Sequence, residues 1–185
     1  MAGNEEIFEG VRLGRYSNEP NKLAKDLSKY INDEVFFVCI GTDRNIGDSF
    51  GPFVGTFLKE KGYDNVIGTI DDPVHAKNLE DRMKEVPKNR TVIAIDASVS
   101  SEKNIGLLSF HSGKLFPGSG VGKNLPSVGD FHINGIVSGD TKDSYMNLMR
   151  MANLRLSDVI ELSKQCVAAI ESAFPLKCNN IVAVV

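Results

Sequence analysis

Two aspartates stand close to where short apolar segments end. Asp48 follows the apolar segment 35–41 and opens a stretch with helical character, and Asp96 ends the apolar run VIAI within the segment 91–97. Each has an ordinary structural explanation, because aspartate caps helices and stabilises turns. Together they also have a chemical one, because two neighbouring carboxyl groups cannot both ionise easily and therefore share a proton. Such a pair can activate water and protonate a leaving amine, as peptide hydrolysis requires.

Further acidic residues occur in the loops after the same apolar segments. Asp43 lies in the first of these loops, and Asp71 and Asp72 begin the next one, which also contains His75. His75 can orient a carboxylate or contact a substrate, and an ordinary loop histidine is an equally good explanation. Gathered carboxylates can also hold a divalent cation through their oxygens. We therefore predict no cofactor, with a divalent metal at this acidic edge as the open alternative.

A loop rich in glycine and proline covers residues 117–124. It does not match a phosphate-binding loop, because Pro117 stands where that motif needs glycine and Asn124 where it needs serine or threonine. We interpret it as a flexible loop that lines the site. The residues predicted to contact substrate are Gly41, Asp43, Asp71, Asp72, His75, Gly118 and Gly120.

The elements that position these residues follow from hydrophobic periodicity. Short, continuously apolar segments are typical of buried strands, and apolar residues every three or four positions indicate helices. Gly51 and Gly55 weaken the helix that contains them, so another backbone is expected to approach it closely there. Strands are expected at 35–41, 65–70, 91–97, 105–111 and 131–139. Helices are expected to begin at Pro20, Asp48, Leu79 and Ser157, with a further helical stretch at 146–154, and residues 1–17 are expected to be irregular.

Apolar strands that alternate with helices imply crossover connections and a mostly parallel sheet with helices on both faces. The predicted fold is a single-domain α/β protein, a three-layer α/β/α sandwich. Some antiparallel pairing is expected among the later strands, since helices separate them less clearly. Ligands bind beyond the carboxyl ends of parallel strands in such sheets, which is where Asp48 and Asp96 are expected. His132 alternates with apolar neighbours and is predicted to be structural, and His111 is given no role.

The composition excludes several classes of protein. The chain has 185 residues, 42% of them apolar and 24% charged, with a net charge of -3, which argues against intrinsic disorder. Its longest apolar run is far shorter than the roughly 20 residues of a membrane helix. The acidic first residues do not form a secretory signal. Three cysteines without a C-x-x-C spacing are expected to be reduced thiols in a cytoplasmic protein, with neither a membrane nor a nucleic-acid partner.

The chain contains, in this order, the segments FVCIGTDRNIGDSFGPFVG, GTIDDPVHAKNL, VIAIDA, PGSGVGKNLPSVGD and HINGIV. Their combination closely resembles the YyaC-type family of sporulation proteins. That family is similar to the spore germination protease, which degrades small acid-soluble DNA-protecting proteins when a spore germinates. It is more distantly similar to the hydrogenase maturation endopeptidases. The resemblance implies a phosphorylase/hydrolase-like fold and a place in the forespore or spore core.

The motifs of the germination protease fall on the same two aspartates. Its aspartate followed by Ala-Leu-Gly-Pro is matched by Asp48 with Ser-Phe-Gly-Pro, and its Ile-Asp-Ala run is matched around Asp96. The resemblance implies that these two are the catalytic pair of an endopeptidase acting on a protein or peptide, such as small acid-soluble spore proteins. This chain is much shorter and lacks the long insertions of that protease, so substrate recognition does not transfer.

Two alternatives to the endopeptidase remain open at this stage. One is a metal-binding or small-ligand-binding hydrolase on the same scaffold, although no histidine stands in a context that matches the maturation endopeptidases. The other is a non-catalytic sporulation binding protein, because a fold does not guarantee a function. A homo-oligomer is compatible with the sequence.

Overall fold

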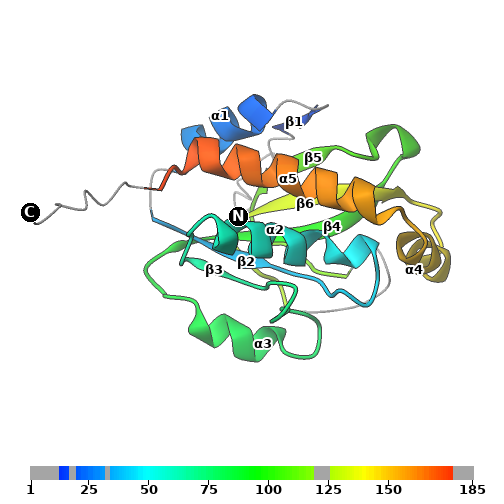
Figure 1. Ribbon diagram of the computed structural model, residues 1–185, viewed down its shortest axis with the longest axis horizontal. Helices are drawn as coiled ribbons and strands as arrows, with labels where there is room; N and C mark the ends of the chain where they lie inside the picture. The colour runs from blue at the N-terminus through cyan, green and yellow to red at the C-terminus, as the bar shows by residue number, and fades with distance from the viewer. Residues whose placement is uncertain (1–12, 17–19, 32–33, 119–125, 177–185) are drawn as a thin grey trace, which may run out of the picture.

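The computed structural model describes residues 13–16, 20–31, 34–118 and 126–176 (Figure 1). Within these residues, six strands form one sheet in the order β1-β5-β6-β4-β2-β3. The strands are β1 (Leu13–Tyr16), β2 (Val35–Cys39), β3 (Val66–Ile67), β4 (Thr91–Ser100), β5 (Leu108–Ser112) and β6 (Phe131–Gly139). The helices are α1 (Pro20–Tyr30), α2 (Phe50–Glu60), α3 (Leu79–Arg82), α4 (Ser144–Ala152) and α5 (Leu156–Ala173).

The sheet is mixed, with a parallel part and an antiparallel edge. Strands β3, β2, β4 and β6 pair in parallel, whereas β5 runs antiparallel to β6 and β1 antiparallel to β5. The antiparallel pairing arises where no helix separates β5 from β6 in the chain, because parallel neighbours need a long crossover connection. The predicted mostly parallel, mixed sheet is therefore confirmed.

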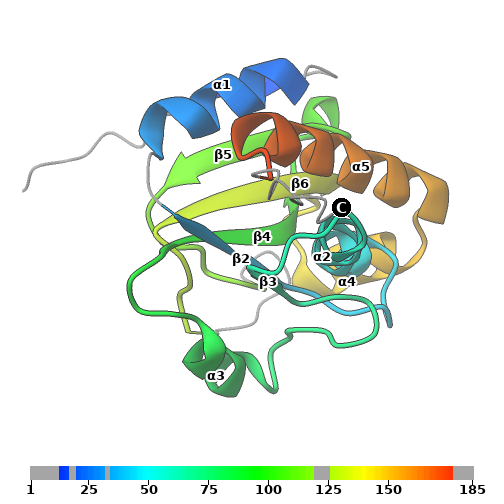
Figure 2. The same ribbon diagram turned by 60° about the vertical axis from the view of Figure 1, so that its left-hand side comes forward.

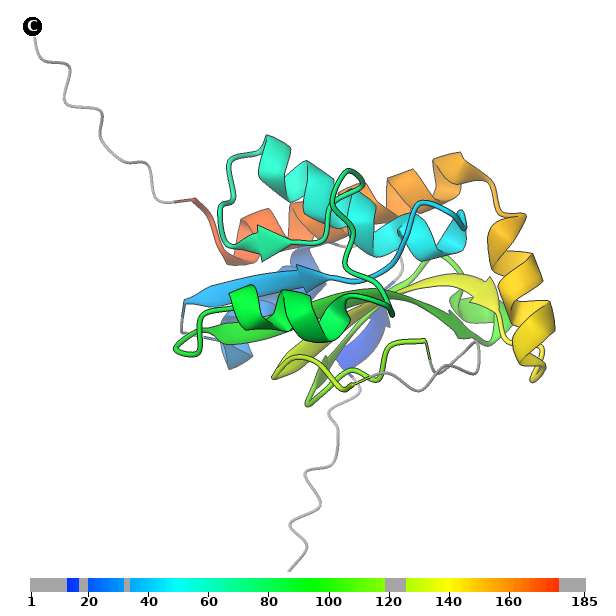
Figure 3. The same cartoon turned by 90° about the horizontal axis from the view of Figure 1, so that it is seen from below.

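Helices cover the two faces of the sheet unequally. Helices α1, α2 and α5 form one layer and pack on the larger apolar core, which includes Phe37, Ile95 and Ile133 (Figure 2). Helix α3 covers part of the opposite face through Leu79; Figure 3, seen from below, shows α2 and α5 above the strands and α3 in front of them. The smaller core on that face joins strand residues to Leu79 of α3 and to Leu115 and Val128 of the long loop. The expected layers on both sides are present, but the second one is thin.

Backbone contacts hold α2 against the parallel strands. A Cβ atom added at Gly51 would lie 2.1 Å from the carbonyl oxygen of Ile40, and one at Gly55 would lie 2.1 Å from that of Gly68. No side chain fits at either position, so the helix can lie this close to the sheet only because both residues are glycine. The close backbone approach predicted from these two glycines is confirmed.

Some elements differ in length from the prediction. Strand β3 has two residues instead of the six of 65–70, because Gly68 turns the chain with a φ of +89° beside the carbonyl of Cys39. Strand β4 is longer than 91–97, because residues Ala97–Ser100 continue to pair with β6. Part of the segment 1–17, expected to be irregular, forms β1 through its pairing with β5. Each difference comes from a contact with a distant segment.

No helix in the described part of the chain has the length and apolarity that crossing a bilayer would need.

Two cysteines lie buried between the sheet and its helical layer. Cys39 of β2 and Cys166 of α5 are free thiols and fully buried. Burial raises the pKa of both thiols, and the charge of Cys166 adds to the effect at Cys39. Because the thiolate is the reactive form, we expect neither to react with DTNB in the native protein at about pH 8 and both to react after denaturation. The assay uses a Cys178→Ser variant so that the signal reports on these two alone, and rapid labelling of the native variant would contradict the expectation.

Candidate functional site

Asp48 and Asp96 line the same two hollows in the structure. Asp48 lies in the 3-10 turn Gly47–Ser49 after β2, and Asp96 lies within β4. Both contribute to two neighbouring hollows of about 240 and about 320 Å³, called here the first and the second hollow. Asp96 is 6% exposed, and its Oδ1 accepts a 2.8 Å hydrogen bond from the N–H of Ala97. The two residues that the sequence singled out thus line the same space.

The hollows open where one strand ends and its neighbour continues. Strand β2 stops at Cys39, which is opposite Ile95 in β4, so Asp96 lies just beyond the last β2–β4 pair. The sequence placed Asp96 at the end of its strand, whereas β4 continues to Ser100 beside β6. The open edge therefore comes from the shorter length of β2.

Gly41 lets the turn that carries Asp48 fold back onto the end of β2. The N–H of Gly41 donates to the carbonyl of Val74 at 2.8 Å, and the N–H of Thr42 donates to that of Asp48 at 3.1 Å. A Cβ atom on Gly41 would lie 1.9 Å from the carbonyl oxygen of Asp48, and the φ of Gly41 is +142°. Only glycine fits this turn, so Gly41 positions Asp48 and also lines the first hollow.

Basic side chains also line the first hollow. It contains Gly41, His75 and Gly118, three of the residues predicted to contact substrate, together with Arg44 and Lys77. His75 is held in its loop, since its Nδ1 accepts a 3.3 Å hydrogen bond from the N–H of Lys77. The sequence analysis did not single out Arg44 or Lys77. Their positive charges offset the negative charge of the aspartates and can attract an anionic group to this side of the site.

The second hollow contains His132 and Asn134, two polar residues of β6. Asn134 lies opposite Asp96 in the parallel pair, and its Oδ1 is buried and has no hydrogen-bond partner among the described residues. The ring of His132 stacks on that of His111 with centroids 5.0 Å apart, and its Nδ1 lies 2.9 Å from the carbonyl oxygen of Gly113. The sequence could have indicated these two residues, because polar residues at alternate positions of an apolar strand lie on one face of the sheet.

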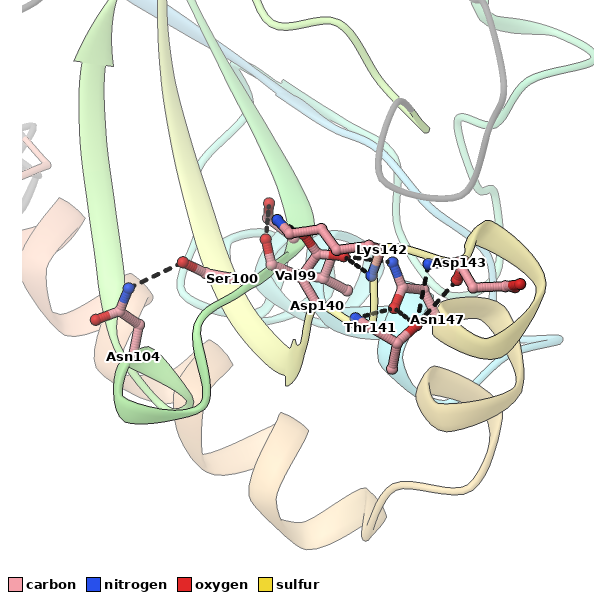
Figure 4. Close-up of polar contacts among 9 residues, drawn as sticks. Val99, Ser100, Asn104, Asp140, Thr141, Lys142, Asp143 and Asn147 are labelled. Carbon is pink, nitrogen blue, oxygen red and sulfur yellow. Dashed lines mark hydrogen bonds and ion pairs between the residues drawn. The ribbon is translucent and has the colours of Figure 1, made fainter.

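A polar network at the end of β6 holds α4 beside the second hollow (Figure 4). Asp140 accepts hydrogen bonds from Lys142 and from the Nδ2 of Asn147, and these bonds keep the pKa of its carboxyl well below the usual value. Asp143 caps α4 by accepting a 2.8 Å bond from the N–H of Met146. The helix fixed in this way places Met151 in the lining of the second hollow.

Some of the predicted residues do not join the pair. Asp43 is exposed and lines neither of the two hollows. Asp71 and Asp72 line a separate hollow, where Asp72 forms a 2.8 Å ion pair with Arg82. Gly120 lies outside the described residues. Within residues 13–16, 20–31, 34–118 and 126–176, no three His, Cys, Asp or Glu side chains gather in a way that could hold a metal ion.

The pKa of His132 makes stability depend on pH. Burial lowers this pKa below the usual 6.5, and the hydrogen bond to Gly113 only partly opposes the effect. As the pH falls, His132 takes up a proton at a higher pH in the unfolded chain than in the native protein, so the free energy of unfolding should decrease as the pH falls through about 6.5. Urea unfolding at about pH 7.5 and about pH 5.5 should show this decrease in the wild type and a smaller one in His132→Gln. Equal decreases in the two proteins would contradict the assignment.

Comparisons with known proteins agree with the motifs found in the sequence. The model of a family described as "Protein of unknown function (DUF1256)" matches residues 15–169. The protein named "Uncharacterized protein YyaC" from Bacillus subtilis (strain 168) is 42% identical over 146 residues, which cover 76% of this chain and 70% of that protein. The [NiFe] hydrogenase maturation protease HybD from Thermococcus kodakarensis aligns with a TM-score of 0.48 and 17% identity, over 75% of this chain and 97% of HybD. The predicted kinship with YyaC is confirmed, and the chain belongs to the DUF1256 family.

Proposed function

We propose that this protein is an endopeptidase in which Asp48 and Asp96 activate a water molecule. One observation carries the proposal: the two aspartates line the same two hollows at the open edge beside the end of β2. A buried aspartate that only stabilised its own strand would not need a second carboxylate beside a shared space. A pair of carboxyl groups that share a proton supplies both an acid and a base.

The reaction follows from that shared proton. The ionised carboxylate accepts a proton from water while the water oxygen bonds to the carbonyl carbon of the peptide. The protonated carboxyl group donates its proton to the peptide oxygen, which gives a neutral tetrahedral intermediate. The carboxyl group that took up the water proton then gives it to the nitrogen as the C–N bond breaks. The other carboxylate takes a proton from a hydroxyl of the intermediate, which leaves a new carboxyl group, a new amine and the original aspartate pair. General acid and base groups of this kind contribute about 10²–10⁴-fold to a rate.

The basic side chains of the first hollow support this chemistry. Arg44 and Lys77 line it together with both aspartates. Positive groups beside the pair favour its ionised carboxylate, which acts as the base of the reaction. They also suit the new carboxylate of the product. The side of the site with Arg44 and Lys77 is therefore assigned to the part of the substrate that becomes the new C-terminus.

Small acid-soluble spore proteins are the proposed substrates, in the forespore or the spore core. This part of the proposal is supported by the resemblance of the segments around Asp48 and Asp96 to those of the germination protease. Incubating purified protein with small acid-soluble spore proteins across a range of pH, and recording intact masses, tests it. Pairs of fragments whose masses sum to the substrate plus one water are expected. Intact substrate at every pH would contradict the assignment of these proteins as substrates.

A further inference from the structure

A third hollow adjoins the site on the same face of the sheet. It has a volume of about 260 Å³ and shares Ser98, Val99 and Asn134 with the second hollow. Ser109 of β5 also lines it and lies opposite Asn134, which in turn lies opposite Asp96. Directly opposite residues of neighbouring strands share a face of a sheet. The hollow therefore continues the aspartate site across β6 towards β5.

Two amide side chains of this hollow, those of Asn104 and Asn134, each have a buried oxygen. Asn104 is 8% exposed, and its Nδ2 donates a 2.9 Å hydrogen bond to the Oγ of Ser100 (Figure 4). The Oδ1 of Asn104 is buried and has no hydrogen-bond partner in the described part of the chain, and the same is true of the Oδ1 of Asn134. Turning the Asn104 amide over would exchange its two ends, so that its Nδ2 would lack a partner instead. Buried polar groups are normally paired, and unpaired ones are costly, so these amides favour a ligand with hydrogen bonds to offer.

The lining of the hollow is polar but carries no formal charge. Among the described residues, its polar side chains are hydroxyls, amides and one imidazole, with no Asp, Glu, Lys or Arg; they are Ser98, Ser100, Asn104, Ser109, His111 and Asn134. An ionic group placed here would lose its hydration without gaining a counter-charge, which is unfavourable. A purely apolar group would leave the two amides unpaired. A neutral group that both donates and accepts hydrogen bonds satisfies the lining.

We propose that this hollow is a binding site for a carboxamide, namely the side chain of a glutamine or an asparagine in a polypeptide. A carboxamide has two donor hydrogens and an acceptor oxygen, so it can pair with Asn104, Asn134 and the serine hydroxyls. The hollow is large enough to hold such a side chain. If the proposed function is correct, on which this last step rests, the amide belongs to a residue close to the bond that is cleaved.

Binding of capped single residues tests this proposal without any cleavage. The full chain labelled with ¹⁵N is titrated with the N-acetyl methylamide of glutamine, and with those of glutamate and leucine as controls. The side-chain NH₂ signals of Asn104 and Asn134 should shift with the glutamine probe, which should bind at least about tenfold more tightly than either control. Shifts with all three probes alike would show recognition of the backbone amides and would overturn the proposal, and so would the absence of shifts.

Two leucine substitutions in β5 form a matched pair. Ser109→Leu places a larger apolar side chain in the hollow, whereas Ser112→Leu makes the same change at an exposed position outside the lining. Only Ser109→Leu should abolish binding of the glutamine probe, with thermal melting to establish that both variants fold. Binding retained in folded Ser109→Leu would overturn the proposal.

The binding test can contradict the carboxamide site without contradicting the peptidase, and the cleavage test can do the reverse. Asp48→Asn should still bind the glutamine probe, because Asp48 does not line the third hollow. Cleavage of polypeptides without probe binding would overturn the carboxamide site alone. Probe binding by a protein that cleaves nothing would support the site and contradict the peptidase.

Discussion

Asp48→Asn and Asp96→Asn are each expected to lower the rate of peptide cleavage by about 10²–10⁴-fold while the protein stays folded. Asparagine has nearly the same shape as aspartate but neither accepts nor donates the catalytic proton. At position 96 its amide oxygen can still accept the hydrogen bond from the N–H of Ala97. Fragment formation followed by intact mass, with each variant at the same concentration as the wild type, measures the effect.

The double variant should cleave the substrate only slightly more slowly than either single variant. In the proposed mechanism the two carboxyl groups share one proton and act as a unit, so removing either one already removes the mechanism. Asp64→Asn is the matched control, because Asp64 is exposed and lines none of the three hollows. Wild-type cleavage by both single variants would rule out the aspartate pair, whatever reaction the protein catalyses.

Gly51→Ala is expected to lower the free energy of unfolding by at least about 2 kcal/mol. In an isolated helix the same change would stabilise the helix by about 1 kcal/mol. The sign of the change in the free energy of unfolding therefore distinguishes helix propensity from the steric clash. The loss is expected because the new methyl group would lie 2.1 Å from the carbonyl oxygen of Ile40, a backbone atom that cannot rotate away. Urea unfolding followed by circular dichroism gives the measurement.

Ala168→Gly supplies the control for helix propensity. Ala168 is an exposed residue of α5, so exchanging it for glycine measures the alanine–glycine difference without a packing contribution. The free energy of unfolding of this variant should be lower than that of the wild type by about 1 kcal/mol. If Gly51→Ala were instead stabilising by a similar amount, the close approach of α2 to the end of β2 would be wrong, and with it the packing that supports the turn carrying Asp48.

The pattern of apolar residues was sufficient to predict the strands and helices whose buried residues are continuous or strictly periodic. The apolar run at 35–41 became β2, buried on both faces, and residues 131–139 became β6 with the predicted bounds. The helices expected to begin at Pro20 and Ser157 formed as α1 and α5, the latter starting one residue earlier. These segments bury apolar side chains that recur at the period of their own backbone, so they need little information from elsewhere in the chain.

The lengths of the strands at the sheet edges depend on contacts with distant segments, which the local sequence pattern does not show. Residues 65–70 are apolar enough for a strand, but the turn at Gly68 beside Cys39 ends β3 after two residues. The chain then leaves the sheet before Asp71 and Asp72, and Arg82 pairs with Asp72 away from the site. This is why the structure does not bring the acidic residues of that loop to the two aspartates.

The sequence by itself determined the chemistry that is available: two aspartates after apolar segments, the glycines that allow a close turn, and the alternation of strands and helices. Only the tertiary structure decided which residues share a space. It placed Asn134 opposite Asp96, brought Arg44 and Lys77 to one side of the pair, and left the amide of Asn104 partly unpaired in an adjoining hollow. The physical reason is that secondary structure depends on short-range periodicity, whereas the register of β4 with β6 and the early end of β2 depend on contacts between residues far apart in the chain.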